Sequence, residues 1–297
     1  MRIRLLAAVL ALLMAPTPAA AWSFEAHRFI VDRAIALLPP ALKPFFESRR
    51  AFIVERSVDP DLWRTAGFLA EPPNHFLDMD WEGYGPYPFD ALPRDYDRAV
   101  AKFGKETVDR YGTLPWRTAE FHGELTRAFA SVAEAPYALD NIAFYSAVLA
   151  HYVSDAHVPF HAVLNYDGQL TNQRGVHSRF ESQLFERERP RLTIAPAAPV
   201  AVTNARDAIF ETLLVGVTLT DGVLAADKAA VAGREFYDDG YFEAFKAGAG
   251  PILERRVNES ISAVAAFIIG AWEAAGRPEV PLETPRRPRR IPRPPQP

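Results

Sequence analysis

The sequence predicts an all-α protein, a single helical-bundle domain with long loops folded over one end. Apolar residues recur at three- and four-residue steps through most of the chain, which is the period of a helix with one buried face. Alternating apolar–polar runs typical of strands are scarce, and the one tempting segment, 192–202, is interrupted by prolines. Residues 22–276 are numerous enough for one large domain.

The first predicted helix covers residues 27–38 and ends at Pro39 and Pro40, because proline lacks the amide hydrogen that a helix interior needs. The same period predicts helices over 96–111, 118–133, 139–158, 176–187, 204–221 and 252–274. Residues 59–93 are rich in Pro, Gly and Asp, so long loops that serve a site are expected there. No glycine-rich phosphate loop or nucleophile elbow is visible in the sequence.

Both ends of the chain differ in composition from this body. Residues 1–21 combine two early arginines, a short apolar run and an A-x-A ending, which predicts a secretory signal cleaved between Ala21 and Trp22. The mature domain, 22–276, would then be secreted or periplasmic. Residues 277–297 are rich in arginine and proline and predict a disordered tail, which could touch anionic envelope lipids or only keep the protein soluble.

The net charge of the whole chain is −4, although the tail is basic, so the body is acidic. By charge alone, such a body is a poor general binder of polyanions.

The segment HYVSDAHVPFH carries the strongest functional signal. It places His151 and Asp155 four residues apart, with His161 six residues further on. In the later segment GVHSRFE, His177 and Glu181 are again four apart. A four-residue step returns to the same helix face, so each pair could hold a metal ion, or form only a salt bridge. An ionised aspartate within an apolar helix is costly unless a positive charge compensates it, which favours a metal.

The chain has no cysteine, which excludes disulfides and thiolate ligands. Any metal would therefore be bound by imidazole nitrogen and carboxylate oxygen, a donor set that suits zinc better than manganese or iron. Two further histidines receive a different interpretation: His157 is expected to pack beside the ligands, and His122 to lie at the surface.

Taken together, these motifs resemble the trinuclear zinc phosphodiesterases, which comprise the bacterial zinc-dependent phospholipases C and the single-strand-specific zinc nucleases. The family pattern is a mature N-terminal tryptophan, a nearby histidine, an aspartate, a histidine in a His-Phe context, H-x3-D-x5-H and H-x3-[DE]. This chain matches the pattern in order from Trp22 to Glu181. Beyond Glu181 the resemblance rests on helical character.

The resemblance implies three zinc ions, with Asp155 shared between two of them. The implied ligands are Asp61, His75, His151 and Asp155 for the first ion, His161, His177 and Glu181 for the second, and Trp22 (through its amino group and carbonyl), His27 and Asp155 for the third. Asp59 is the alternative to Asp61, which is preferred because Leu62, Trp63 and Arg64 follow it, as in the D-x-x-R of the nucleases.

Zinc lowers the pKa of bound water to about 7, so the resemblance implies that a zinc-bound hydroxide hydrolyses a phosphodiester. Asp61 would orient the water and Arg64 would neutralise phosphate charge. Phe76 and Asp78 would face the metals and contact the substrate, unless they are only a loop aromatic and a turn residue. Glu25 would contact a phospholipid headgroup, or would only be a favourable charge at a helix N-terminus.

The substrate class stays open between phospholipid and single-stranded nucleic acid. A phospholipase C-like enzyme is the first expectation, because of the absence of cysteine, Glu25, the short interval from His161 to His177, and glutamate at position 181. The short interval from Trp22 to His27 favours the nucleases, as does Arg64. No stable protein partner is predicted. A further alternative is a secreted zinc-binding protein without catalysis.

Overall fold

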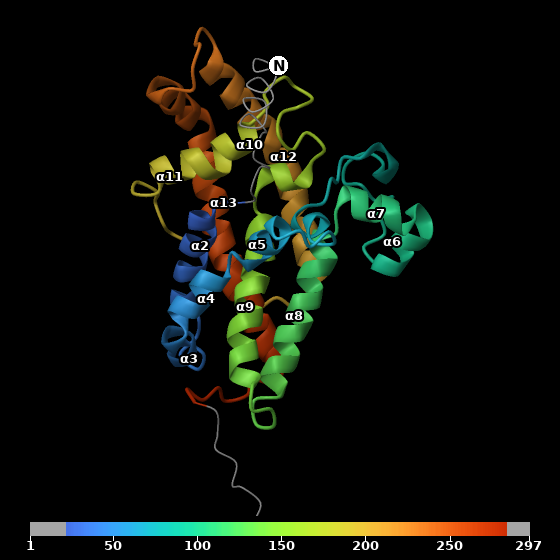
Figure 1. Cartoon of the computed structure of the whole chain (residues 1–297), viewed down its shortest axis with the longest axis vertical. Coiled ribbons are helices and arrows are strands. Elements are labelled where there is room, and N and C mark those ends of the chain that lie inside the picture. The colour runs from blue at the N-terminus through green and yellow to red at the C-terminus, as the bar shows by residue number, and fades with distance from the viewer. Residues whose placement is uncertain (1–21, 284–297) are drawn as a thin grey trace, which may run out of the picture.

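Two long helical hairpins form the centre of the protein in the computed structural model, which describes residues 22–283 (Figure 1). The first hairpin pairs α8 (Leu114–Ala130) with α9 (Ala138–Asp155), and the second pairs α12 (Ala205–Val231) with α13 (Asp239–Ala274). Helix α8 packs against both helices of the second hairpin. No β-strand forms within the described residues, so the prediction of an all-α bundle is confirmed.

The N-terminal part of the described chain forms four short helices that pack around the bundle: α2 (Phe24–Ala36), α3 (Lys43–Ser48), α4 (Arg50–Arg56) and α5 (Asp59–Thr65). Helix α2 begins after Ser23, whose hydroxyl accepts a hydrogen bond from the Ala26 amide, and it packs against α9 and α13. The predicted loop region 59–93 is only partly loop. It contains α5, with Pro60 in its first turn, and the 3-10 turns η1 (Pro72–His75) and η2 (Glu82–Tyr84).

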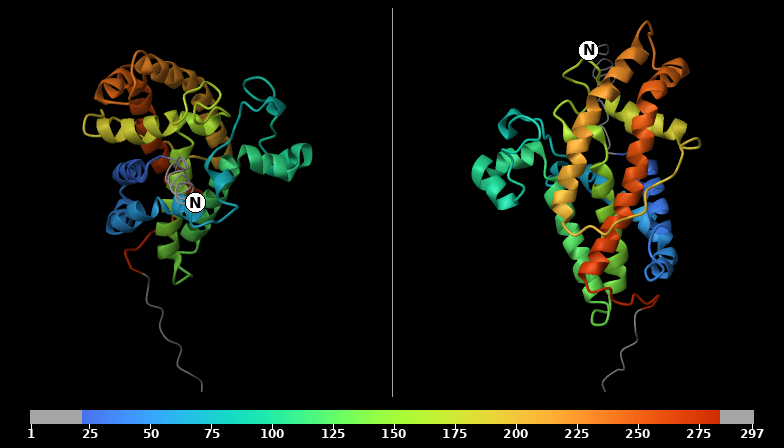
Figure 2. Two further views of the ribbon diagram at one scale, coloured as in Figure 1. Left: turned by 45° about the horizontal axis from the view of Figure 1, so that its top comes forward. Right: turned by 180° about the vertical axis from the view of Figure 1, so that it is seen from behind.

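The predicted helix 96–111 is divided into α6 (Tyr96–Phe103) and α7 (Lys105–Tyr111). Gly104 separates them with a φ of +83°, a conformation that a glycine adopts without strain. Together α6 and α7 project from the side of the bundle (Figure 2).

The second hairpin is longer than predicted at the turn that joins its helices. Helix α12 continues past residue 221 to Val231, and α13 begins at Asp239, well before the predicted start at 252. By length and composition α12 could cross a membrane, but one of its faces packs against α13, α8 and the 3-10 turn η3 (Pro159–Ala162) within the bundle.

The predicted helix over 176–187 is irregular. It consists of α10 (Val176–Ser178), a π-helical segment η4 (Arg179–Leu184) and α11 (Phe185–Glu188). Insertions of π-helix often mark functional positions. Residues 192–202 run alongside α13 without forming a strand. The predicted signal segment, 1–21, and most of the predicted tail, 284–297, lie outside the described residues.

Candidate metal centre

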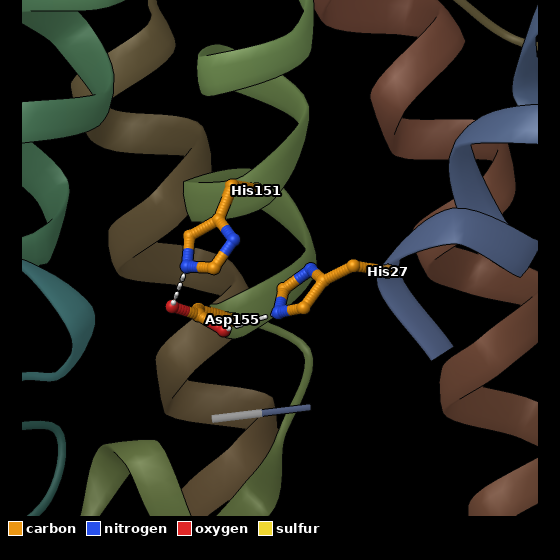
Figure 3. A group of neighbouring side chains, drawn as sticks. All are labelled: His27, His151 and Asp155. Atoms are coloured by element: carbon orange, nitrogen blue, oxygen red, sulfur yellow. Dashed lines mark ion pairs between the residues drawn. The ribbon is translucent and has the colours of Figure 1, made fainter. Parts of the chain in front are cut away.

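Asp155 lies at the C-terminal end of α9 and is completely buried. Its Oδ2 is 2.9 Å from Nδ1 of His75 and 3.2 Å from Nε2 of His151. Its Oδ1 is 3.4 Å from Nε2 of His27 and 3.8 Å from Nδ1 of His161. Figure 3 shows His27 and His151 converging on this carboxylate from α2 and α9. One carboxylate therefore faces four imidazoles from separate parts of the fold.

Three groups of buried side chains are each close enough to hold a metal ion, since the ligand atoms of a group lie within 4.8 Å of one another. The groups are His27, His151 and Asp155; Asp61, His75 and His151; and His161, His177 and Glu181. The structure thus brings together every side chain that the sequence pattern named as a ligand. The predicted sets share Asp155, whereas these groups share His151 and contain Asp155 only once.

Many donor atoms of these groups are buried and make no hydrogen bond within the described part of the chain. They include both ring nitrogens of His27 and His177, both carboxylate oxygens of Asp61 and Glu181, and Oδ1 of Asp155. Buried polar atoms are normally hydrogen-bonded, so a convergent set without partners calls for a ligand. Nitrogen and oxygen donors in this arrangement fit a divalent cation.

Burial and the neighbouring imidazoles act in opposite directions on the carboxylates. Burial alone would raise the pKa of Asp155, but His151 and His161 outweigh it and hold that pKa well below its usual range. For Glu181, burial dominates and raises the pKa to about 7, although His177 opposes the rise. Burial also lowers the pKa of His161 well below its usual range, so this ring is neutral and able to bind a cation.

Backbone contacts fix the orientation of two of the expected ligands. Nδ1–H of His151 donates to the Ser57 carbonyl oxygen at 2.8 Å, which leaves Nε2 to face Asp155 and His75. The His161 carbonyl oxygen accepts from the Leu77 amide at 2.9 Å, so η3 is tied to the segment that follows His75.

Arg256 on α13 is a residue that the sequence did not indicate. Its buried guanidinium donates to the carbonyl oxygens of Ala156 and His157, at 3.2 and 2.7 Å. These carbonyls belong to the short connection between Asp155 and His161. Arg256 therefore stabilises the backbone that joins two candidate ligands, Asp155 and His161. His157 itself belongs to none of the three groups, and its Nδ1–H donates to the Val153 carbonyl oxygen, in agreement with its expected packing role.

Trp22 is also brought to this region. Its indole is buried, and Nε1–H donates to the Ser154 carbonyl oxygen at 2.9 Å, one residue before Asp155. The predicted third ion would use the amino group of Trp22, which exists only after cleavage at Ala21, so this part of the ligand set stays a prediction.

We predict that Asp61→Asn weakens metal binding by at least about a hundredfold, whereas Asp59→Asn leaves it unchanged. Both aspartates are buried, but Asp61 belongs to a metal-binding group, while Asp59 lies 3.4 Å from Arg56. Zinc titration in competition with a chromogenic chelator would measure the difference. An equal loss in the two variants would contradict the choice of Asp61.

A pocket of about 450 Å³ opens beside the metal-binding groups. It is lined by Arg64, Pro72, His75, Phe76, Asp78, Arg110, Phe160, His161, Tyr166 and His177. The predicted substrate residues Phe76 and Asp78 are therefore placed beside candidate ligands, as is Arg64, whose Nη2 lies 3.0 Å from Oδ1 of Asp61. Arg110 and Tyr166 were not anticipated, because they come from α7 and from a loop without a motif.

The backbone at Phe76 depends on Gly112, whose φ is +101°. A Cβ atom at Gly112 would lie 2.1 Å from the Phe76 carbonyl oxygen, so no other residue fits without displacing this wall of the pocket. Next to Phe76, burial and the nearby Asp80 raise the pKa of Asp78 to about 7, and Oδ1 of Asp78 has no hydrogen-bond partner. Asp78 thus offers a buried acceptor to a substrate.

Glu25 is not placed in this pocket. Its carboxylate is half-exposed and pairs with Arg28 at 3.2 Å and Arg189 at 3.0 Å, beside a separate surface hollow. The structure therefore supports the alternative interpretation of Glu25, an acidic residue in the first turn of α2.

No protein-family model matches the chain, and no curated protein matches it. The family resemblance consequently rests on the motifs and on their convergence in space.

Proposed function

We propose that the protein is a zinc-dependent phosphodiester hydrolase. The observation that carries this proposal is the position of Asp155, which faces four imidazoles next to a pocket that also contains Arg64. A closed structural zinc site is shielded from substrate, whereas here His75, His161 and His177 line an open pocket. The position of these histidines on the wall of a pocket favours catalysis over a purely structural or scavenging role.

When bound, zinc supplies Lewis acidity that activates water and withdraws charge from phosphate oxygens. The side chains of the protein orient the phosphate group and the attacking water. The Arg64 guanidinium, held 3.0 Å from Asp61, lines the pocket and can donate to a phosphate oxygen. Oδ1 of Asp61 is the atom that pairs with Arg64, and Oδ2 makes no hydrogen bond, so Oδ2 can accept a proton from the attacking water.

Two placements favour a single-stranded nucleic acid over a choline phospholipid as the substrate. The expected headgroup residue, Glu25, is paired with arginines outside the pocket. Inside the pocket, Phe76 and Tyr166 provide aromatic rings, and Arg110 adds a second guanidinium to Arg64. Aromatic rings stack on bases, and guanidinium groups pair with phosphates. A phospholipase C-like activity remains the second candidate, on the sequence features that favour it.

The deciding experiment compares cleavage of single-stranded DNA with release of p-nitrophenol from p-nitrophenyl phosphorylcholine, each with zinc and with chelator. Zinc-dependent cleavage of either substrate supports the diesterase proposal and identifies the class. A fully zinc-loaded protein that is inactive on both would overturn it in favour of a non-enzymatic zinc-binding protein.

For a nuclease, Phe76→Ala is expected to raise the KM for single-stranded DNA by about tenfold or more, because stacking contributes about 1–3 kcal/mol per base. Phe52→Ala is the matched control, since Phe52 is exposed on α4 and does not line the pocket. An unchanged KM in Phe76→Ala would argue against base stacking at this wall.

A further inference from the structure

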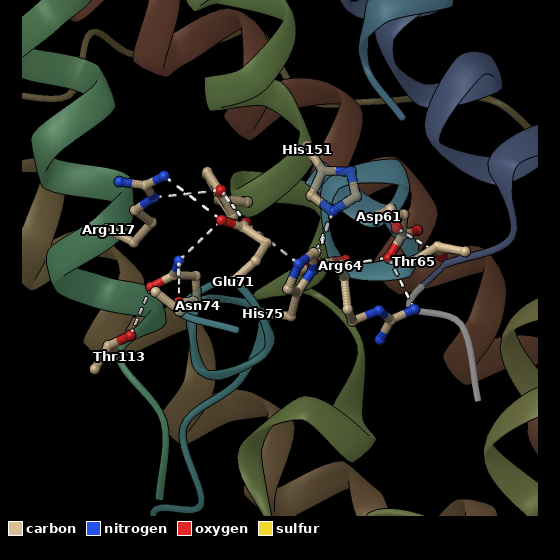
Figure 4. A network of polar contacts seen from close by, with 12 residues as sticks. Asp61, Arg64, Thr65, Glu71, Asn74, His75, Thr113, Arg117 and His151 are labelled. Atoms are coloured by element: carbon tan, nitrogen blue, oxygen red, sulfur yellow. Dashed lines mark hydrogen bonds and ion pairs between the residues drawn. The ribbon is translucent and has the colours of Figure 1, made fainter. Parts of the chain in front are cut away.

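A buried carboxylate lies on the side of His75 that faces away from the metal-binding groups. Glu71 is 5% exposed and immediately precedes η1. Its Oε1 accepts from the Tyr152 hydroxyl at 2.5 Å, and its Oε2 accepts from Nδ2 of Asn74 at 3.2 Å. Nη2 of Arg117, from α8, lies 3.6 Å from Oε2. Figure 4 shows this network beside His75.

The two ring nitrogens of His75 have different surroundings. Nδ1 faces the metal-binding groups, at 2.9 Å from Oδ2 of Asp155 and 3.1 Å from Nε2 of His151. Nε2 faces the other way and lies 3.5 Å from Oε1 of Glu71. Nδ1 is therefore the metal-facing atom, and a metal bound there would leave the ring hydrogen on Nε2, toward the carboxylate.

We propose that Glu71 is the positioning residue for His75: its carboxylate accepts Nε2–H, fixes the tautomer and presents Nδ1 to a metal. Tyr152, Asn74 and Arg117 hold the carboxylate in place from three separate elements. This inference rests on the metal centre of the proposed function, but not on the hydrolysis of any diester.

Two observations support an active role for this carboxylate. Tyr152 directly follows the metal-facing His151 on α9. The same helical turn therefore carries the His151 ring and the hydroxyl that holds Glu71 beside the His75 ring. His151 uses the Ser57 carbonyl for the same purpose, whereas Nε2 of His75 faces a carboxylate at 3.5 Å.

The sequence contains a weak signal for this role. Glu71 and His75 are four residues apart, the same spacing as in the two metal-binding pairs. Pro72 and Pro73 lie between them, so the spacing does not indicate a regular helix. The 3-10 turn nevertheless brings the two side chains together.

The test is the zinc affinity of Glu71→Gln, measured by chelator competition on the purified protein, together with the absorption spectrum of the cobalt-substituted form. The amide keeps the size of the side chain but removes its charge. We expect zinc to bind about ten- to a hundredfold more weakly at one site, with a changed cobalt spectrum. Glu120→Gln is the matched control, because Glu120 pairs with the same arginine, at 2.8 Å, but is exposed.

Tyr152→Phe is a second variant, which keeps the ring but removes the hydroxyl that holds Glu71. It should shift zinc affinity in the same direction by a smaller factor. A merely structural role would lower the stability of the metal-free protein while leaving zinc affinity and the cobalt spectrum unchanged. That result in Glu71→Gln would overturn the inference, as would an equal loss in Glu120→Gln.

Failure of this inference and failure of the proposed function give different results. Weaker zinc binding in Glu71→Gln, in a protein that cleaves no diester, would support the positioning role and reject the hydrolase. If the wild-type protein is an active hydrolase but Glu71→Gln binds zinc unchanged, the hydrolase proposal is supported and the positioning role is rejected.

Discussion

Asp155→Asn is expected to remove zinc from more than one site and to lower phosphodiester hydrolysis by about a thousandfold. The two oxygens of Asp155 face separate imidazoles, His75 and His151 on one side and His27 on the other. Loss of its charge therefore affects two metal-binding groups together. Metal catalysis contributes several kcal/mol, and about 4 kcal/mol corresponds to this change in rate. Metal analysis and initial rates on the substrate identified by the paired assay would measure both losses.

The control for this change is Asp140→Asn, on the same helix. Asp140 is exposed and lies 3.5 Å from Arg49, outside the metal-binding groups. It should retain zinc and activity. An Asp155→Asn protein with full zinc and normal turnover would defeat the proposed role of Asp155.

The substitution should also destabilise the metal-free protein at neutral pH. Because the pKa of Asp155 is depressed in the folded state, its ionised carboxylate contributes stability above its unfolded pKa, near 3.8. That contribution is lost as the pH falls through the depressed value. The difference in unfolding free energy between wild type and Asp155→Asn should therefore narrow in acid.

The fold class and the two ligand pairs followed from local patterns, because each depends on spacing within one segment. His151 and Asp155 form one pair and His177 and Glu181 the other; the structure groups the first pair with His27 and the second with His161. No spacing rule states that the pairs must meet, however. The family resemblance supplied that expectation.

Other features depend on tertiary packing that local patterns do not contain. The predicted helix 252–274 begins directly after Pro251, and proline costs about 3 kcal/mol inside a helix. Packing along α12 nevertheless keeps Pro251 within α13. Arg256 is one charged residue in a long helix, and only the folded structure shows that it binds the carbonyls beside Asp155.

Removing the metals is expected to lower the melting temperature by about 8–16 °C for each tightly held ion. A ligand at about a thousand times its dissociation constant stabilises the folded state by about 4 kcal/mol. In a domain of this size, each kcal/mol shifts the melting temperature by about 2–4 °C. The structural reason is the set of buried carboxylates and imidazoles, many of whose donor atoms make no hydrogen bond within the described chain. Calorimetry of the zinc-loaded protein, with and without chelator, would measure the shift.

The shift should shrink as the pH falls below 7. Burial raises the pKa of Glu181 to about 7, so in acid a proton occupies a carboxylate that must be ionised to bind the metal. Zinc must then displace this proton, which weakens its binding and its contribution to stability. The Asp155→Asn protein, with fewer metals to lose, should show a smaller response to chelator at every pH. A zinc-loaded wild-type protein whose melting temperature does not respond to chelator would contradict the coupling between metal and fold, because these buried groups would then be stable without a cation.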